Sequence, residues 1–120
     1  MPGLQKGSFE SPDEARRVGD VGTIQIVKLD GLTATRVTYQ PGWRWSEHIK
    51  PIAGTDSCQV DHRGTILAGR IHVVMNDGTE ADAGAGDVYV IPPGHDAWVV
   101  GDEPLTFVDV SPQMEHYAKP

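Results

Sequence analysis

The chain has a single cysteine, Cys58, so no disulfide can form within it. Packing and backbone pairing must therefore hold the fold, as in reducing compartments, and we expect a cytoplasmic protein. No apolar run approaches the roughly 20 residues that a membrane-spanning helix needs. Segment 1–7 lacks the apolar core of a signal peptide. These absences argue against a membrane partner.

Positive charge is also scarce. Ten lysines and arginines stand against 17 aspartates and glutamates, which gives a formal net charge of −7 at pH 7. The basic residues are scattered along the chain and form no cluster. An acidic chain of this kind repels a phosphate backbone, so nucleic acid is not expected as a partner.

Long helical patterns are absent as well. The 120 residues fit one domain, and the 14 glycines and 9 prolines fall between short β-branched runs. That arrangement predicts a mostly β protein. The one helical signal is segment 11–17, where a cap residue precedes proline and acidic residues precede basic ones. We therefore predict a short N-terminal helix there.

Short strands are predicted along the rest of the chain. Segments 23–29 and 32–40 flank the dipeptide Asp30-Gly31, whose preference for positive φ angles predicts a hairpin. Further strand patterns lie at 43–49, 57–67, 70–75, 87–91, 97–100 and 105–110. Eight or more strands at this spacing predict a jelly roll or closed barrel. The tail 113–120 is expected to form a last helical turn or to fray.

Two stretches resemble the two sequence motifs of the cupin superfamily. The first covers 42–70. The second covers 86–95 and reads Gly-Asp-Val-Tyr-Val-Ile-Pro-Pro-Gly-His. In cupins the first motif is glycine, five residues, His-x-His, a short gap, Glu, six residues and glycine. The second is glycine, five residues, Pro-x-Gly, two residues and His. The glycines and the proline of this chain fall in register with both.

The resemblance spans 42–110, and whole strings of the chain resemble a bacterial subgroup of small cupins. It implies an all-β double-stranded β-helix, the jelly-roll cupin barrel, with 1–20 as an N-terminal extension and 113–120 as a tail. It also implies an interior site for a small molecule. In the second motif, Pro-Pro-Gly makes a stiff turn that aims the next side chains at the cavity mouth.

The motif positions give the candidate site residues. His48 falls on the first motif histidine, which the resemblance implies points into the barrel. Lys50 stands at the second, and because an ammonium has no lone pair for a cation it would bind an anionic substrate group, turn to solvent or replace the metal. The glutamate position holds His62, whose neutral imidazole is an acceptable ligand. The last histidine position holds Ala97, but His95 lies two residues earlier with the same strand parity.

His48, His62 and His95 could thus form a three-histidine site for a divalent metal ion, with Zn, Fe, Ni, Mn and Cu as candidates. Strand alternation puts Cys58 on the inward face with His62. There Cys58 could be a soft ligand, a nucleophile or a substrate contact, although buried cysteines commonly act as apolar filler. The alternative is that His95 hydrogen-bonds with Asp96 at the mouth, while His48 and His62 are satisfied by each other or by water.

Four aromatic residues lie beside the motif positions and could line a pocket for an apolar or ring-shaped ligand: Trp43, Trp45, Tyr89 and Trp98. Trp43, Trp45 and Trp98 have the opposite parity to the motif positions, however, which favours packing against a neighbouring sheet, the N-terminal segment or a second subunit. By the same argument His72 faces outward, and His116 lies in the tail.

Two functions follow from these residues. One is a metal-dependent cupin enzyme acting on a small organic molecule, of the dioxygenase, isomerase or lyase type. The other is a metal-free binding or sensing module in which Lys50, His48 and His62 hold a polar ligand. By analogy with cupins of this size we also expect a homodimer.

Overall fold

The computed structural model describes residues 3–119, which form two antiparallel sheets with short helices. The strands are β1 (Glu14–Val18), β2 (Gly22–Leu29), β3 (Leu32–Tyr39), β4 (His62–Ala68), β5 (Arg70–Met75), β6 (Glu80–Gly84), β7 (Val88–Ile91), β8 (His95–Val99) and β9 (Leu105–Asp109). The helical segments are α1 (Trp45–His48), α2 (Lys50–Ala53) and the 3-10 helix η1 (Pro112–His116). The predicted all-β fold is confirmed.

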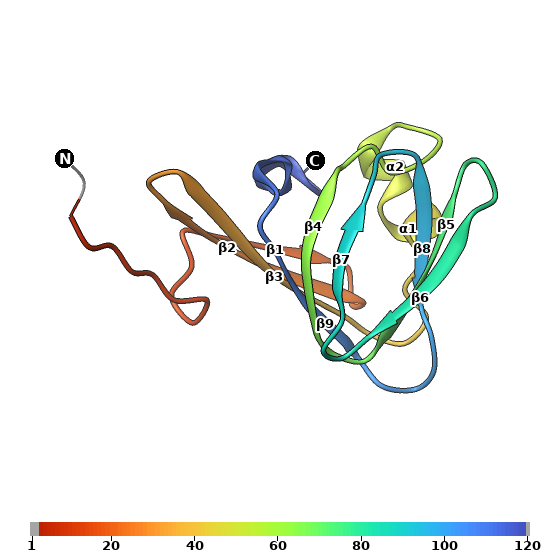
Figure 1. Ribbon diagram of the computed structural model, residues 1–120, viewed down its shortest axis with the longest axis horizontal. Coiled ribbons are helices and arrows are strands. Elements are labelled where there is room, and N and C mark those ends of the chain that lie inside the picture. Colours follow the sequence, from red (N-terminus) through yellow and green to blue (C-terminus); the bar gives the residue numbers. More distant parts are fainter. Residues whose placement is uncertain (1–2, 120) are drawn as a thin grey trace.

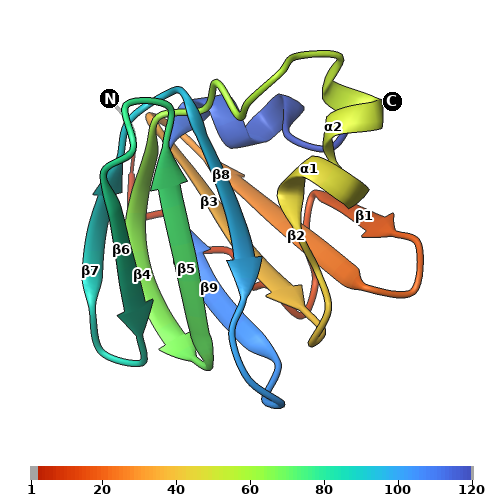
Figure 2. The same ribbon diagram turned by 90° about the vertical axis from the view of Figure 1, so that its right-hand side faces the viewer.

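The larger sheet has the order β1-β2-β3-β9-β4-β7 and the smaller one β6-β5-β8. Figures 1 and 2 show the two sheets facing each other, with α1, α2 and the C-terminal segment at one end of the sandwich. Between the sheets lies an apolar core whose most buried members include Ile24, Ile26, Val37, Tyr39, Leu105 and Met114. Within residues 3–119 no helix is long and apolar enough to cross a membrane.

The β2–β3 hairpin forms as predicted. Its register ends on the pair Leu29↔Leu32, so Asp30 and Gly31 make a two-residue turn, and Gly31 has φ 76°. A positive φ costs glycine nothing, which is why this dipeptide suits the turn. The hairpin supplies two of the six strands of the larger sheet.

The predicted N-terminal helix is wrong, because residues 14–18 form strand β1. This strand pairs with β2 from Glu14↔Ile26 to Val18↔Gly22. Arg16 donates to the carbonyl of Tyr117 at 2.8 Å and so ties the strand to the C-terminal segment. A helix of one or two turns is marginal by itself, whereas pairing with an open strand edge satisfies the backbone of the whole segment.

The predicted strand 43–49 is also wrong. Arg44 is extended, and the chain then turns into α1 and α2. Trp45 and Ile49, four residues apart, are both buried, which is the spacing of one helix face. Conversely, β6 was not predicted, because its sequence Glu-Ala-Asp-Ala-Gly lacks the β-branched residues typical of strands.

Candidate metal centre

Three buried side chains with metal-binding atoms meet at the helical end of the sandwich: Cys58, His62 and His95. They are 2%, 7% and 3% exposed, and their donor atoms all lie within 4.8 Å of one another. Cys58 Sγ is 3.6 Å from His62 Nε2, and the two imidazole centroids are 5.2 Å apart. Of the residues that the structure describes, these are the ones that could together hold an ion.

Backbone pairing brings the group together. His62 is the first residue of β4 and His95 the first of β8, so the two belong to different sheets. Cys58 joins them, because its N–H donates to the His95 carbonyl at 2.8 Å and its own carbonyl accepts from Gly94 N–H at 2.7 Å. Gly94 has φ 93°, a backbone conformation that favours glycine after the two prolines. The Pro-Pro-Gly turn therefore fixes His95 against Cys58.

Asp109 orients the His62 ring. Its Oδ2 accepts a hydrogen bond from His62 Nδ1 at 3.0 Å, and the residue is fully buried. Nε2 consequently faces Cys58. Burial would lower the pKa of His62, but the hydrogen bonds with Asp109 and Cys58 and their charges raise it to about 9.

A backbone carbonyl orients His95 in the same way. His95 Nδ1 lies 2.8 Å from the carbonyl oxygen of Pro92, which can only accept, so Nδ1 carries the hydrogen. In the neutral ring Nε2 then has the free lone pair. Metal-binding histidines commonly donate their second ring N–H to a carboxylate or a backbone carbonyl, and here one histidine does each.

Cys58 is activated by the two histidines. Burial raises the pKa of a thiol, but hydrogen bonds and charges from His62 and His95 outweigh that and lower the pKa of Cys58 to about 6. The thiolate, which is the metal-binding form, is therefore available at neutral pH. The same arrangement, in which a carboxylate orients an imidazole next to a thiol, also activates nucleophilic cysteines in enzymes.

Asp109 was not among the residues predicted from the sequence. Besides His62 it accepts from Tyr89 Oη at 3.1 Å and from Ser111 N–H at 2.8 Å. It pairs with Gly64 of β4, where an added Cβ would lie 2.7 Å from Tyr89 Oη. A signal existed, because Asp109 shares strand parity with the apolar inward residues Leu105 and Phe107 of β9.

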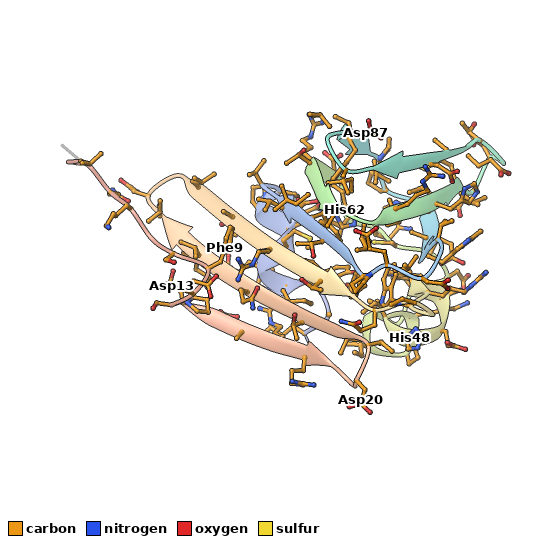
Figure 3. The ribbon with its side chains drawn as sticks, turned by 90° about the horizontal axis from the view of Figure 1, so that it is seen from below. Phe9, Asp13, Asp20, His48, His62 and Asp87 are labelled. Atoms are coloured by element: carbon orange, nitrogen blue, oxygen red, sulfur yellow. The ribbon has the colours of Figure 1, made fainter. Side chains whose placement is uncertain are left out.

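The structure does not group His48 with His62 and His95, and Figure 3 shows His48 apart from His62. His48 lies on α1, with Nδ1 3.1 Å from the Arg44 backbone and Nε2 3.1 Å from a Glu47 carboxylate oxygen. Lys50 begins α2, is half-buried, and does not line the cavity beside the metal group. A strand would have put both on one face, but in a helix residues two apart point in different directions. Cys58 takes the place predicted for His48.

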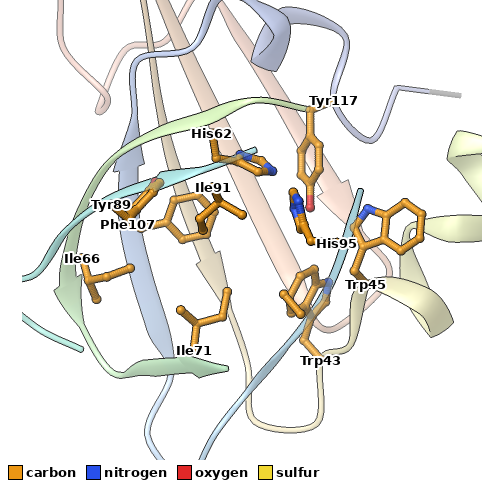
Figure 4. Close-up of a pocket in the computed structure, with 11 residues that line it drawn as sticks. Trp43, Trp45, His62, Ile66, Ile71, Tyr89, Ile91, His95, Phe107 and Tyr117 are labelled. Atoms are coloured by element: carbon orange, nitrogen blue, oxygen red, sulfur yellow. The ribbon is translucent and has the colours of Figure 1, made fainter. Parts of the chain in front are cut away.

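A cavity between the sheets adjoins the metal group (Figure 4). Its volume is about 30 Å³. His62 and His95 form its polar wall, and the remainder is Trp43, Trp45, Ile66, Ile71, Tyr89, Ile91, Ala97, Phe107 and Tyr117. The prediction that Trp43 and Trp45 pack away from the pocket is therefore wrong, because the turn into α1 swings both rings inward.

The other parity predictions agree with the structure. Trp98 lies on the outer face of β8, beside the His72 ring at 4.9 Å and under the Arg44 guanidinium at 4.1 Å. His72 pairs with the exposed carboxylates of Asp82 and Glu80. Neither side chain lines the cavity.

A second, more open pocket of about 270 Å³ lies on the other side of the metal group. Cys58 lines this pocket, together with residues of α2 and of the C-terminal segment. Trp45 and Tyr117 line both spaces and so form the wall between them. The metal group can therefore be approached from the helical end of the sandwich.

The donor set fits a divalent metal ion. Across a tetrahedral zinc ion, a thiolate sulfur and an imidazole nitrogen are ~3.5 Å apart, given the usual bond lengths. The 3.6 Å between Cys58 Sγ and His62 Nε2 matches that separation. The three donors could thus hold a metal, with a further position left for water or substrate.

Comparison with known proteins gives the fold. No family model matches the chain, and no curated protein matches its sequence. A protein of unknown function from Rhizobium leguminosarum is similar in structure, with a TM-score of 0.64 and 20% identity over 92% of this chain and 97% of that one. An RmlC-like cupin from Shewanella frigidimarina has a TM-score of 0.60 and 17% identity over 94% and 96%.

The polyketide cyclase RemF from Streptomyces resistomycificus has a TM-score of 0.61 and 17% identity over 90% of this chain and 78% of that one. At sequence identities of 17–20%, the structural similarity shows the fold alone. It agrees with the two motif stretches, with the paired antiparallel sheets and with an interior cavity. This chain has the cupin fold.

Proposed function

We propose that the protein binds a divalent metal ion through Cys58, His62 and His95 and acts on a small organic molecule held in the adjoining cavity. The observation that carries the proposal is the orientation of the two histidines. Asp109 and the Pro92 carbonyl hold their Nδ1–H groups, so the two Nε2 atoms are the ring nitrogens left to bind a metal, once His62 Nε2 has given up the proton that it shares with Cys58.

The donors narrow the choice of metal. Thiolate and imidazole suit zinc, iron, copper or nickel better than manganese, which prefers oxygen ligands. A bound ion would supply a Lewis acid beside the cavity. The chain's own residues would do the rest: Asp109 keeps a proton on His62 Nδ1, and the apolar wall excludes water from the reacting molecule. This supports lyase, isomerase or dioxygenase chemistry of the kind expected for small cupins.

A metal-free binding module is the second candidate. The direct Cys58–His62 contact and the His62–Asp109 hydrogen bond satisfy the polar side-chain atoms that they join without an ion. A thiolate–imidazolium pair could then fix a polar ligand at the cavity wall. The two functions share the cavity and differ in whether a metal enters the group.

Cobalt(II) titration distinguishes the two candidates. We expect near one equivalent to bind with a thiolate-to-cobalt charge-transfer absorption. Because Cys58 is the single cysteine of the chain, that absorption can come from no other residue. It should disappear in Cys58→Ser. A titration without this absorption in the wild-type protein would contradict the metal site and favour the metal-free module.

Zinc binding should release protons in a pH-dependent way. Since the pKa of His62 is raised to about 9 and that of Cys58 lowered to about 6, between these values His62 carries a proton and Cys58 does not. Zinc must displace about one proton from His62 in this window, so the zinc affinity rises about tenfold per pH unit. Below the Cys58 pKa a further proton must leave and the dependence steepens.

Calorimetry in buffers of different ionisation enthalpy measures this release. Binding at neutral pH without any proton release would mean that His62 is not protonated in the metal-free protein. That result would contradict the account of the Cys58–His62–Asp109 hydrogen bonds.

A further inference from the structure

Two hydrogen-bond donors in the cavity wall have no partner. The indole nitrogens of Trp43 and Trp45 are buried and make no hydrogen bond within residues 3–119, and each side chain belongs to a residue only 2% exposed. Both rings line the cavity beside His95 (Figure 4). Buried donors without partners are destabilising and uncommon, so two in one small cavity point to a missing acceptor.

Neither indole is free to turn toward a partner elsewhere. The Trp43 ring stacks on Tyr39 with 3.8 Å between centroids and an interplanar angle of 7°. Trp45 begins α1, and the next residue, Ser46, donates its N–H to Asp96 at 3.0 Å. In Figure 4 the nitrogen of Trp45 lies on the side of the ring toward Tyr117 and His95. The donors are therefore fixed in place before any ligand arrives.

The rest of the cavity wall indicates which kind of molecule supplies the missing hydrogen-bond acceptor. Apart from the two histidines, no charged side chain lines the cavity, and most of the wall is aliphatic or aromatic. An ammonium group there would be desolvated without a counter-charge. A water molecule could accept from the indoles, but it would also have two hydrogens to place against a wall that is mostly aliphatic or aromatic, whereas a carbonyl oxygen has none.

We infer that the cavity binds a small uncharged organic molecule with a carbonyl oxygen. The oxygen accepts from the indole N–H groups of Trp43 and Trp45, and the apolar part of the molecule packs against Ile71 and Phe107. The inference rests on the proposed function, since it names the substrate class of the same site. The small cavity volume limits the ligand to a few heavy atoms.

The indole N–H signals in a ¹⁵N NMR spectrum test this directly. The chain has three tryptophans, and Trp98→Phe identifies the signal of the one that lies outside the cavity. Acetone is the probe, and isobutene, which has the same shape but no acceptor, is its control. We expect acetone to move the two remaining indole signals and isobutene to leave them near their free positions. Unmoved indole signals would overturn the inference, as would equal shifts with both probes.

Binding affinities give a second test. Loss of one neutral hydrogen bond in Trp45→Phe should weaken acetone binding roughly fivefold and leave isobutene binding unchanged. Trp98→Phe is the matched control and should change neither. A similar loss in both variants, or none in Trp45→Phe, would contradict the assigned donor.

Running the NMR titration with and without zinc separates the two claims. If zinc fails to bind but the indole signals respond to acetone, the proposed metal site fails and the ligand class stands. If zinc binds and the indole N–H signals do not move, the inference fails and the metal site stands.

Discussion

Zinc affinity should fall by more than about a hundredfold when His62 is replaced by alanine. Loss of a residue that only hydrogen-bonds to a metal ligand usually costs about 10- to 100-fold in affinity, and loss of a ligand itself should cost more. His62 supplies one of the three donors, and its ring links Cys58 to Asp109. Competition against a chromophoric chelator measures the change.

His48→Ala is the matched control for this prediction. It removes a histidine that the cupin motif marks as a ligand but that lies on α1, hydrogen-bonded to Arg44. We expect His48→Ala to bind zinc with the wild-type affinity. If His48→Ala lost zinc affinity and His62→Ala kept it, the grouping of Cys58, His62 and His95 would be wrong, and His48 would be a ligand as the cupin motif implies.

Asp109→Asn should weaken zinc binding about 10- to 100-fold and lower the free energy of unfolding by about 1–3 kcal/mol. The carboxylate accepts hydrogen bonds from His62, Tyr89 and Ser111 in a fully buried position. An amide has one acceptor oxygen, and its NH₂ group would face a donor. Denaturant unfolding and chelator competition give the two quantities.

A purely structural role for Asp109 would not change the titration of His62. We therefore also expect the pKa of His62 to fall below about 9 in Asp109→Asn, with fewer protons released by zinc at neutral pH. Asp61→Asn is the control, because Asp61 pairs with Arg63 at the surface and should stay within about 0.5 kcal/mol of wild type. Unchanged zinc affinity in Asp109→Asn would show that the carboxylate does not position the ligand.

The fold was predictable because its signals are local. The Asp30-Gly31 dipeptide and the β-branched runs beside it define a hairpin without reference to the rest of the chain. The helix predicted at 11–17 failed for the opposite reason: cap and charge signals favour a helix, but the open edge of β2 offers five residues of strand pairing. Tertiary pairing overrides a weak local propensity.

The site was only partly predictable. Strand parity placed Cys58 and His62 on one inward face, and the structure brings them together with His95. The strand predicted at 43–49 was wrong because the apolar residues of this segment fit two patterns. Trp43 and Trp45 fit the strand period of two, whereas Trp45 and Ile49 fit the helical spacing of four. The contact of Cys58 with His95 joins segments 37 positions apart along the chain, and such pairings have no signature in a single sequence.

The most direct test of the metal centre is the metal content of the full chain purified without a histidine tag or chelator, measured by elemental mass spectrometry. The account predicts about one equivalent of zinc, iron, copper or nickel per chain in the wild-type protein, and little or none in Cys58→Ser. Wild-type protein that stays metal-free even after incubation with these ions would contradict it.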